Sequence, residues 1–195
     1  MERSVVKEFH YITPVANLTS IAAGGILSHS LATKLAHTSV ASETIQDRRV
    51  GKRVPTRLLL HEYVNLYFDA RNSMMFYLKS NSSEPIVVLQ VSQDVLDIPG
   101  AVITDGNAAC NTTQFYISPD GLKHLDQDRV YATWWTDPDP FIKAENKRKR
   151  SAEVLIPERI PVDYIEGFFA KTTNDLDACP ATGIMGEVNG YVFFH

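Results

Sequence analysis

Residues 85–92, PIVVLQVS, constrain the fold most, because they form an almost unbroken run of β-branched and apolar residues. A short run of this kind is typical of a strand that is buried inside a sheet. We therefore expect a central strand here, with other strands paired on both sides.

Short strand and helix patterns alternate along the rest of the chain. Further strands are expected at residues 8–13, 58–68, 101–107, 152–156, 164–170 and 190–195. Short helices are expected at residues 42–49, 72–80 and 118–127, and residues 28–56 otherwise form a long loop. Residues 129–135 are either a strand or the start of a loop. Six to eight strands and three or four short helices in mixed order predict the α+β class.

A further helix is expected to begin at Thr13, as N-cap, with Pro14 at its first position. Gly24 and Gly25 are expected to end it.

Length and composition fit one domain over residues 1–195, because 44% of its residues are apolar. No apolar stretch approaches the roughly 20 residues of a membrane helix, and the first residues do not resemble a secretory signal. We therefore expect a cytoplasmic protein that does not contact a membrane. Cys110 and Cys179 lie far apart and are expected to be free thiols.

The positive charge is concentrated in two places although the net charge is −4. Five of the 19 Lys and Arg residues lie in residues 46–57 and five in residues 143–150. These segments are either two solvated surface loops or two walls of one groove for a nucleic-acid backbone or a dinucleotide.

Several familiar chemistries lack their motifs. The six histidines include no pair at metal-ligand spacing, and the HEYV sequence at His61 lacks the second histidine of a zinc protease helix. No G-x-S-x-G elbow is present. We expect neither a metal nor a serine nucleophile.

Glu153 directly follows a basic run and opens the apolar segment VLI. Alone, such a carboxylate is typical of a solvated strand edge, outside the core. Four segments change this interpretation: FHYIT…NL, IQDRR, YFDARNSMMFY and KRSAEVLI. In their order along the chain and in their local residue patterns they resemble the DarT family of DNA ADP-ribosyltransferase toxins. The resemblance extends over residues 9–194.

The matching positions fall in four motifs. They are Ile12, Thr13, Asn17 and Leu18; Gln46, Arg48 and Arg49; Tyr63, Val64, Tyr67, Phe68, Arg71 and Met74; and Lys149, Arg150, Ala152, Glu153 and Leu155. The departures are Tyr11 and Pro14, where the family has histidine, and Asn65, Ala70 and Ser73, where it has proline.

The resemblance implies an ADP-ribosyltransferase-like fold: mixed or antiparallel central sheets around an NAD cleft, with short flanking helices. It also implies NAD as co-substrate and transfer of ADP-ribose to a base of single-stranded DNA, with release of nicotinamide. Glu153 would bond the ribose 2′-hydroxyl and stabilise positive charge on the sugar. Arg49 would lie beside the NAD and the incoming base, instead of forming a surface pair with Asp47.

Further roles follow from the same resemblance, with alternatives open at several positions. The candidates for binding NAD are His10, Tyr11, Thr13, Asn17, Gln46, Tyr67, Phe68 and Arg71. Either Tyr11 or His10 takes the place of the family's histidine, Thr13 and Asn17 either bind cofactor or cap a helix, and Arg71 lies near the cofactor or a structural carboxylate. At least one of Tyr67 and Phe68 belongs to the core.

The candidates for binding DNA are Arg48, Arg53, Tyr131, Trp134, Trp135, Lys147, Arg148, Lys149 and Arg150. The aromatic ones either stack an unpaired base or fill the core.

The family's usual partner is a macrodomain antitoxin of the DarG type that removes the modification. Relatives modify thymine or guanine, and the unusual first motif favours guanine. Two other functions stay open: an ADP-ribosyltransferase-fold enzyme acting on RNA, similar to tRNA 2′-phosphotransferases, and a catalytically silent nucleic-acid-binding module.

Overall fold

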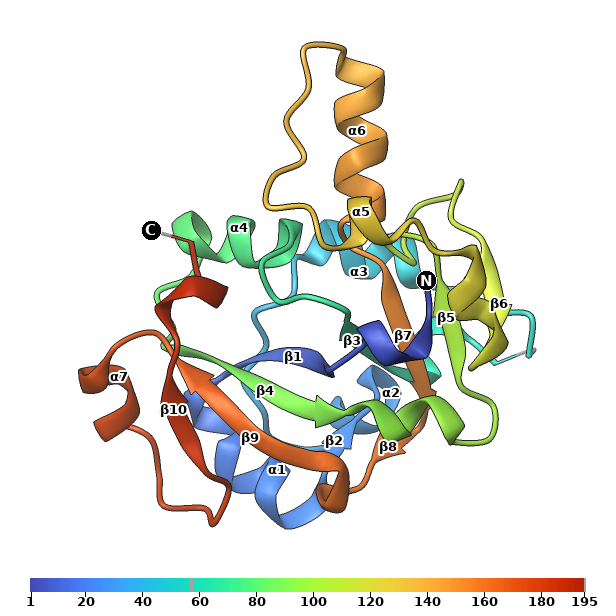
Figure 1. Cartoon of the computed structure of the whole chain (residues 1–195). Helices are drawn as coiled ribbons and strands as arrows, with labels where there is room; N and C mark the ends of the chain where they lie inside the picture. The colour runs from blue at the N-terminus through green and yellow to red at the C-terminus, as the bar shows by residue number, and fades with distance from the viewer. Residues whose placement is uncertain (57, 195) are drawn as a thin grey trace.

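A mixed eight-stranded sheet forms the centre of the molecule, in the order β10-β9-β4-β1-β3-β7-β5-β6 (Figure 1). The computed structural model describes residues 1–56 and 58–194. Within them all neighbouring strands of this sheet are antiparallel except β10 and β9, which are parallel. Two short strands, β2 and β8, pair separately. This arrangement confirms the α+β class.

The elements have the following bounds. The strands are β1 (Glu8–Pro14), β2 (Ile26–Leu27), β3 (Tyr63–Tyr67), β4 (Ile86–Ser92), β5 (Val102–Thr104), β6 (Phe115–Ile117), β7 (Glu153–Pro157), β8 (Arg159–Ile160), β9 (Ile165–Ala170) and β10 (Gly186–Val188). The helices are α1 (Leu18–Gly24), α2 (His29–Ala32), α3 (Glu43–Arg49), α4 (Ser73–Asn81), α5 (Gln127–Val130), α6 (Pro140–Lys149) and α7 (Thr173–Asp177). The 3₁₀ helices are Arg3–Val5, Val15–Asn17, Leu60–Glu62, Gln93–Asp97, Asp120–His124, Val162–Tyr164 and Gly190–Val192.

Strand β4 lies inside the sheet, as its apolar run predicts, and is covered on both faces. Val87, Leu89 and Val91 belong to the core that includes Leu18 and Ile21 of α1. Val88 belongs to a second core with Met75 and Leu78 of α4. Because successive side chains of a strand point to opposite faces, two cores require a continuous apolar run.

The sheet is almost divided between β1 and β3. Strand β1 pairs with β4 along its whole length, from Glu8 opposite Ser92 to Pro14 opposite Ile86. Its pairing with β3 is confined to His10 opposite Tyr67. Strands β1 and β3 therefore diverge beyond the pair His10 and Tyr67. The candidate site lies where the two strands separate.

Several local predictions are wrong. Thr13 and Pro14 are the last residues of β1 and start no α-helix; Pro14 precedes the 3₁₀ turn that begins at Val15, and α1 begins at Leu18. Residues 190–194 form a 3₁₀ turn and a coil instead of a strand, and His195 lies outside the described residues. For residues 129–135 the loop alternative is correct: α5 ends at Val130 and a loop follows. The described residues contain ten strands, more than predicted, because two- and three-residue strands such as β2, β8 and β10 carry too little pattern to detect.

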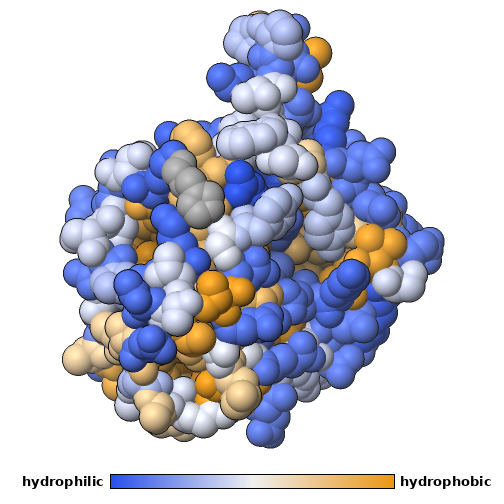
Figure 2. Space-filling view, turned by 60° about the vertical axis from the view of Figure 1, so that its left-hand side comes forward, coloured by the Kyte–Doolittle hydropathy of each residue, from blue (hydrophilic) through white to orange (hydrophobic). Residues whose placement is uncertain are grey.

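Helix α6 projects from the body and contains most of the second basic segment (Figures 1 and 2). It begins with Asp139, whose side chain accepts from the N–H groups of residues 141 and 142, and Pro140 in the first turn. Phe141, near the outer end, is 84% exposed. Among the described residues, no helix has both the length and the apolar composition needed to cross a bilayer.

Candidate active site

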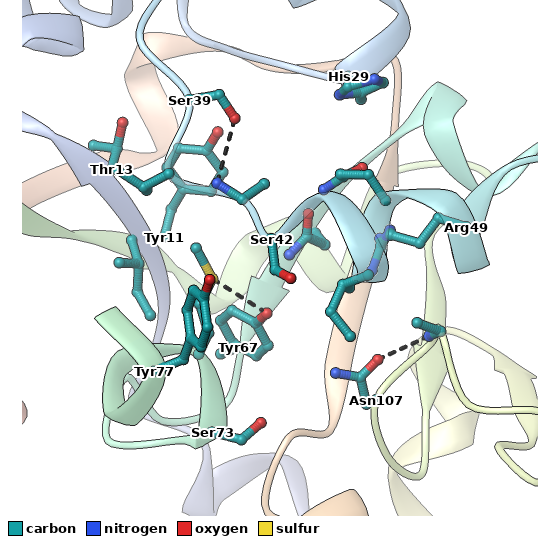
Figure 3. A pocket seen from close by; sticks show the side chains of 18 of the residues that line it. Tyr11, Thr13, His29, Ser39, Ser42, Arg49, Tyr67, Ser73, Tyr77 and Asn107 are labelled. Carbon is teal, nitrogen blue, oxygen red and sulfur yellow. Dashed lines mark hydrogen bonds between the residues drawn. The ribbon is translucent and has the colours of Figure 1, made fainter. Parts of the chain in front are cut away.

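A cavity of about 520 Å³ opens where β1 and β3 diverge. Its walls come from β1, β3, α4, the loop 107–110, one face of α6 and residues 37–49, which we call the cover segment. In Figure 3, Tyr11, Thr13 and Tyr77 stand on one side and Arg49 and Asn107 on the other. Ser42 and Tyr67 lie between them.

Two side-chain amides attach the cover segment to the body. Asn17 donates to the Thr38 carbonyl (2.8 Å), accepts from the Thr38 N–H (3.0 Å) and also donates to Thr13 Oγ1 (3.2 Å). At the other end, Gln46 Oε1 and His61 Nε2 lie 3.0 Å apart. Asn17 thus occupies the N-cap position of α1, but its side chain binds the main chain of the cover segment and makes no capping hydrogen bond.

Glu153 is the first residue of β7, and its side chain is completely buried. Its Oε1 accepts from the Ala108 N–H (2.9 Å) and its Oε2 from Arg49 Nη1 (3.2 Å). Its own N–H donates to Thr104 Oγ1 (3.0 Å). The expectation that this carboxylate lies outside the core is wrong, because β7 is flanked by β3 and β5 and its first residue is enclosed by the loop after β5.

Arg49 lies between this carboxylate and the cavity. It ends α3, is 5% exposed and lines the cavity, whereas Glu153 is not among the lining residues. The guanidinium pairs with Glu153 across 104 residues of sequence, so the alternative of a surface pair with Asp47 is wrong. A buried pair of this kind holds both groups in place, because either one alone would be a desolvated charge.

Five of the eight candidates for binding NAD line the cavity. They are Tyr11, Thr13, Asn17, Gln46 and Tyr67. Burial is the main cause that raises the pKa of Tyr67 well above its usual value, and the negative charge of Glu153 adds to it. Burial also raises the pKa of Tyr11. Both phenols are therefore neutral hydrogen-bond donors. The Tyr67 hydroxyl donates to Met74 Sδ (3.6 Å).

The other three lie elsewhere. His10 is buried beside Glu8, with Nε2 3.0 Å from Oε1, so Tyr11 and not His10 reaches the cavity. Phe68 packs in the core against Phe9, with ring centroids 5.0 Å apart. Arg71 donates to the carbonyls of residues 191 and 193 and lies over aromatic rings, outside the cavity lining, and no described carboxylate forms an ion pair with its guanidinium.

The two basic segments meet at the cavity, but few of their cations face it. Arg48 and Arg49 line it from α3, and Lys147 and part of Arg148 line it from α6. Arg53 is exposed outside the lining, and Arg57 lies outside the described residues.

Arg148 and Arg150 are buried in ion pairs, which corrects their assignment to DNA, although Arg148 also lines the cavity in part; the part-exposed Lys149 stays a candidate. Arg148 is buried between Asp105 (2.7 Å) and Glu145 (2.7 Å), and hydrogen bonding to Glu145 raises its pKa. Arg150 is buried against Asp69 (2.9 Å) and donates to the Val130 carbonyl. Lys149 lies 3.5 Å from Asp126.

The aromatic candidates for stacking a base lie outside the cavity lining. Trp135 fills the second core against Phe76 and Phe194. Tyr131 is half-buried against the first core. Trp134 is half-exposed, with the Arg71 guanidinium 5.3 Å from its ring centroid, and is the most exposed of the three.

The sequence interpretation missed the loop that holds Glu153. Asn107 lines the cavity and accepts from the Ala109 N–H (2.8 Å), and Ala108 supplies its N–H to Glu153. Lys52 Nζ donates to the carbonyls of Ala108 (2.6 Å) and Cys110 (2.5 Å). The only sequence signal was the Asp-Gly-Asn turn after a strand, which indicates a loop and no chemistry.

The cavity suits a small-molecule ligand with a phosphate-bearing part. Its volume is in the usual range for a small-molecule site. Uncharged hydroxyl and amide groups line one end, and Arg48, Arg49 and Lys147 contribute cations. Within residues 1–56 and 58–194, no cluster of three or more His, Cys, Asp or Glu residues is arranged to hold a metal ion.

Comparison with known families gives a match over residues 10–182. The matching family is described as "DarT: ssDNA thymidine ADP-ribosyltransferase, DarT". A DNA ADP-ribosyl transferase of Thermus sp. strain 2.9 is 30% identical in an alignment of 168 residues that covers 80% of this chain and 78% of that protein. A fusion protein of Thermosipho africanus, DNA ADP-ribosyl transferase with DNA ADP-ribosyl glycohydrolase, is 30% identical over 84% of this chain. The chain covers 42% of that fusion protein.

Solved structures of the same proteins share the fold. Thermus sp. 2.9 DarT in complex with ADP-ribosylated ssDNA superposes with a TM-score of 0.81 and 25% identity, over 97% of both chains. Thermosipho africanus DarTG in complex with ADP-ribose gives a TM-score of 0.80 and 26% identity, over 96% of this chain and 51% of that one.

Proposed function

Because the chain belongs to the DarT family of ssDNA ADP-ribosyltransferases, we propose that it transfers ADP-ribose from NAD⁺ to a base of single-stranded DNA, with release of nicotinamide. The observation that carries the proposal is the Glu153 carboxylate, fixed by the Ala108 N–H and Arg49 behind a cavity with cations on its walls. A carboxylate held rigidly in a dry site favours a transition state with positive charge more than it would in water.

The protein's own groups divide the work as follows. Arg49 and the Ala108 N–H orient the Glu153 carboxylate. Since Arg49 covers it from the cavity, the ribose 2′-hydroxyl reaches Oε2 as the guanidinium gives up part of that contact and turns toward the incoming base. Neutral Tyr67 and Tyr11 offer apolar ring faces and O–H donors near the nicotinamide end. Arg48 and Lys147 attract the pyrophosphate and the DNA phosphates.

We further propose thymine as the acceptor base and a toxin role with a DarG-like macrodomain partner. The family description names thymidine, which favours thymine over the guanine suggested by the first motif. The Thermosipho africanus relative combines a transferase and a glycohydrolase in one chain, which supports a partner that reverses the modification. Because this chain corresponds to less than half of that protein, the reversing activity would belong to a separate chain or domain.

The test uses NAD⁺ labelled in its adenylate part, with single-stranded DNA, duplex DNA and RNA of the same sequences. We expect label on single-stranded DNA alone, and mass spectrometry of the digested nucleosides should show ADP-ribosyl-thymidine. Glu153→Gln should lower the rate by about 10²-fold or more, while Glu166→Gln, on the exposed part of β9, should not change it.

Each alternative outcome has a clear meaning. ADP-ribosyl-guanosine would refute the choice of base, and label on RNA only would refute DNA as the substrate. An absence of nicotinamide release under all conditions would refute the enzymatic proposal.

A further inference from the structure

Lys52 lies outside the cavity lining, yet its ammonium group holds the loop that supports Glu153. Its Nζ donates to the carbonyls of Ala108 (2.6 Å) and Cys110 (2.5 Å) and lies 5.6 Å from the centroid of the Phe115 ring. The three N–H groups of the ammonium thus have two carbonyls and one ring face as partners. Hydrogen bonds from a charged donor are stronger than neutral ones.

The same residue is attached to the helix that carries Arg49. The Lys52 N–H donates to the Arg49 carbonyl (3.2 Å), and the Lys52 carbonyl accepts from the Leu60 N–H (2.8 Å). Leu60 is completely buried. The main chain from which the Lys52 side chain extends is therefore fixed at the end of α3 and against the core.

These contacts form a closed ring around the two catalytic candidates. Arg49 donates to Glu153 Oε2, and Ala108 donates to Glu153 Oε1. The ring continues from the Ala108 carbonyl to Lys52 Nζ and from the Lys52 N–H back to Arg49. Ala108 is held on both sides: its N–H by the carboxylate and its C=O by the ammonium.

We infer that Lys52 is a positioning residue, which sets the distance between the Arg49 helix and the Glu153 carboxylate through the loop 107–110. This inference rests on the proposed transferase function. Burial lowers the pKa of Lys52, which agrees with an ammonium that has exchanged part of its water shell for the two carbonyls. Without the ammonium, Ala108 loses its outer anchor, and Glu153 Oε1 loses a fixed donor.

The experiment compares Lys52→Met, Lys52→Arg and Lys52→Gln with a matched control, Lys123→Met, whose side chain is exposed at a distance in sequence from both candidates. Methionine keeps the unbranched stem and removes the charge, arginine keeps a cation with several donors, and glutamine keeps one donor group. Two readouts are used: kcat and KM for NAD⁺ with a thymine-containing single-stranded oligonucleotide, and amide hydrogen exchange of residues 105–113 in the protein alone.

We expect Lys52→Met to lower kcat by about 10- to 100-fold, the scale of a displaced catalytic group, with KM for NAD⁺ within about two-fold of wild type. Amide exchange of residues 105–113 should become faster. Lys52→Arg should restore slow exchange and most of kcat, and Lys123→Met should match wild type. If Lys52→Met does not fold by circular dichroism, Lys52→Gln replaces it, with the same expected direction.

Unchanged exchange of residues 105–113 in the uncharged variant would overturn the inference. So would a wild-type kcat in that variant, or a loss in Lys52→Arg as large as in Lys52→Met. A wild-type protein without transfer activity would refute the proposed function alone, because the exchange measurement still decides whether Lys52 holds the loop.

Discussion

The ion pair between Arg49 and Glu153 allows a quantitative test of how the site is built. Arg49 is 5% exposed and Glu153 0% exposed. Glu153→Ala would leave a buried cation without its partner and the Ala108 N–H without an acceptor. Breaking a buried pair by removing one partner costs about 3–5 kcal/mol. For a chain of this length the melting temperature should fall by about 6–20 °C.

Glu153→Gln should destabilise less, for a reason visible in the geometry. Each carboxylate oxygen accepts from a different donor, Oε1 from the Ala108 N–H and Oε2 from Arg49. An amide has one oxygen, so one of the two donors must face an NH₂ group. The expected cost is that of one unsatisfied buried donor, about 1–3 kcal/mol.

The double variant Arg49→Met/Glu153→Ala completes the cycle. Once both charges are gone, neither is buried alone, so the double variant should be less destabilised than the sum of the single variants. The difference should be about 0.5–3 kcal/mol. Urea unfolding followed by circular dichroism gives the free energy of unfolding of the wild type, the two single variants Arg49→Met and Glu153→Ala, and the double variant. Glu166→Ala, at an exposed position, is the control and should lie within about 0.5 kcal/mol of wild type.

Additivity within about 0.3–0.5 kcal/mol would refute the reasoning, because it would mean that the two groups do not interact. A Glu153→Ala protein as stable as wild type would refute it too, by showing that the carboxylate is not buried in a pair.

Two further predictions concern side chains outside this pair. Trp135→Ala should lower the free energy of unfolding by about 3–5 kcal/mol, because the ring fills the core against Phe76 and Phe194. Trp134→Ala should lower it by about 1 kcal/mol or less. Equal decreases in thermal stability for the two variants would contradict this difference. Burial lowers the pKa of both His29 and His61, whose rings lie 4.3 Å apart. Below about pH 6.5 the unfolded chain therefore binds more protons than the folded protein, so the free energy of unfolding should decrease as the pH is lowered. Melting temperatures between about pH 7.5 and about pH 5.5 should decline less steeply in His29→Asn/His61→Asn, and an unchanged slope would contradict the assignment.

The sequence could predict the place of Glu153 on a strand, but not its burial. The step from a polar, basic segment to an apolar run marks the start of β7 correctly. Whether that start is an edge or an interior depends on β5 and the loop after it, which lie about 45 residues earlier in the chain. Pairings at such separations leave no local pattern, so a carboxylate at a strand start looks solvated.

For the basic run, residues 147–150, the sequence could not predict which cations are buried. Four consecutive cations suggest a solvated surface, yet within a helix consecutive residues face directions about 100° apart. Arg148 thereby turns inward to Asp105, and Arg150, just past the helix, turns to Asp69. Lys147 faces the cavity. The family motifs identified which segments meet, but the acidic partners lie in loops that carry no charge pattern of their own.

The single residue pair that joins β1 to β3 gives the sheet a natural hinge at its centre. A small rotation about the row of His10 and Tyr67 widens or narrows the space beside it without disturbing the ladders within either half. Edge-to-face packing of Phe9 on Phe68, together with the apolar core that β1, β3 and β4 share, resists such a rotation. A molecule that contacts β1 and β3 at the same time therefore holds the two halves of the sheet at one angle. Its release allows the halves to rotate relative to each other again.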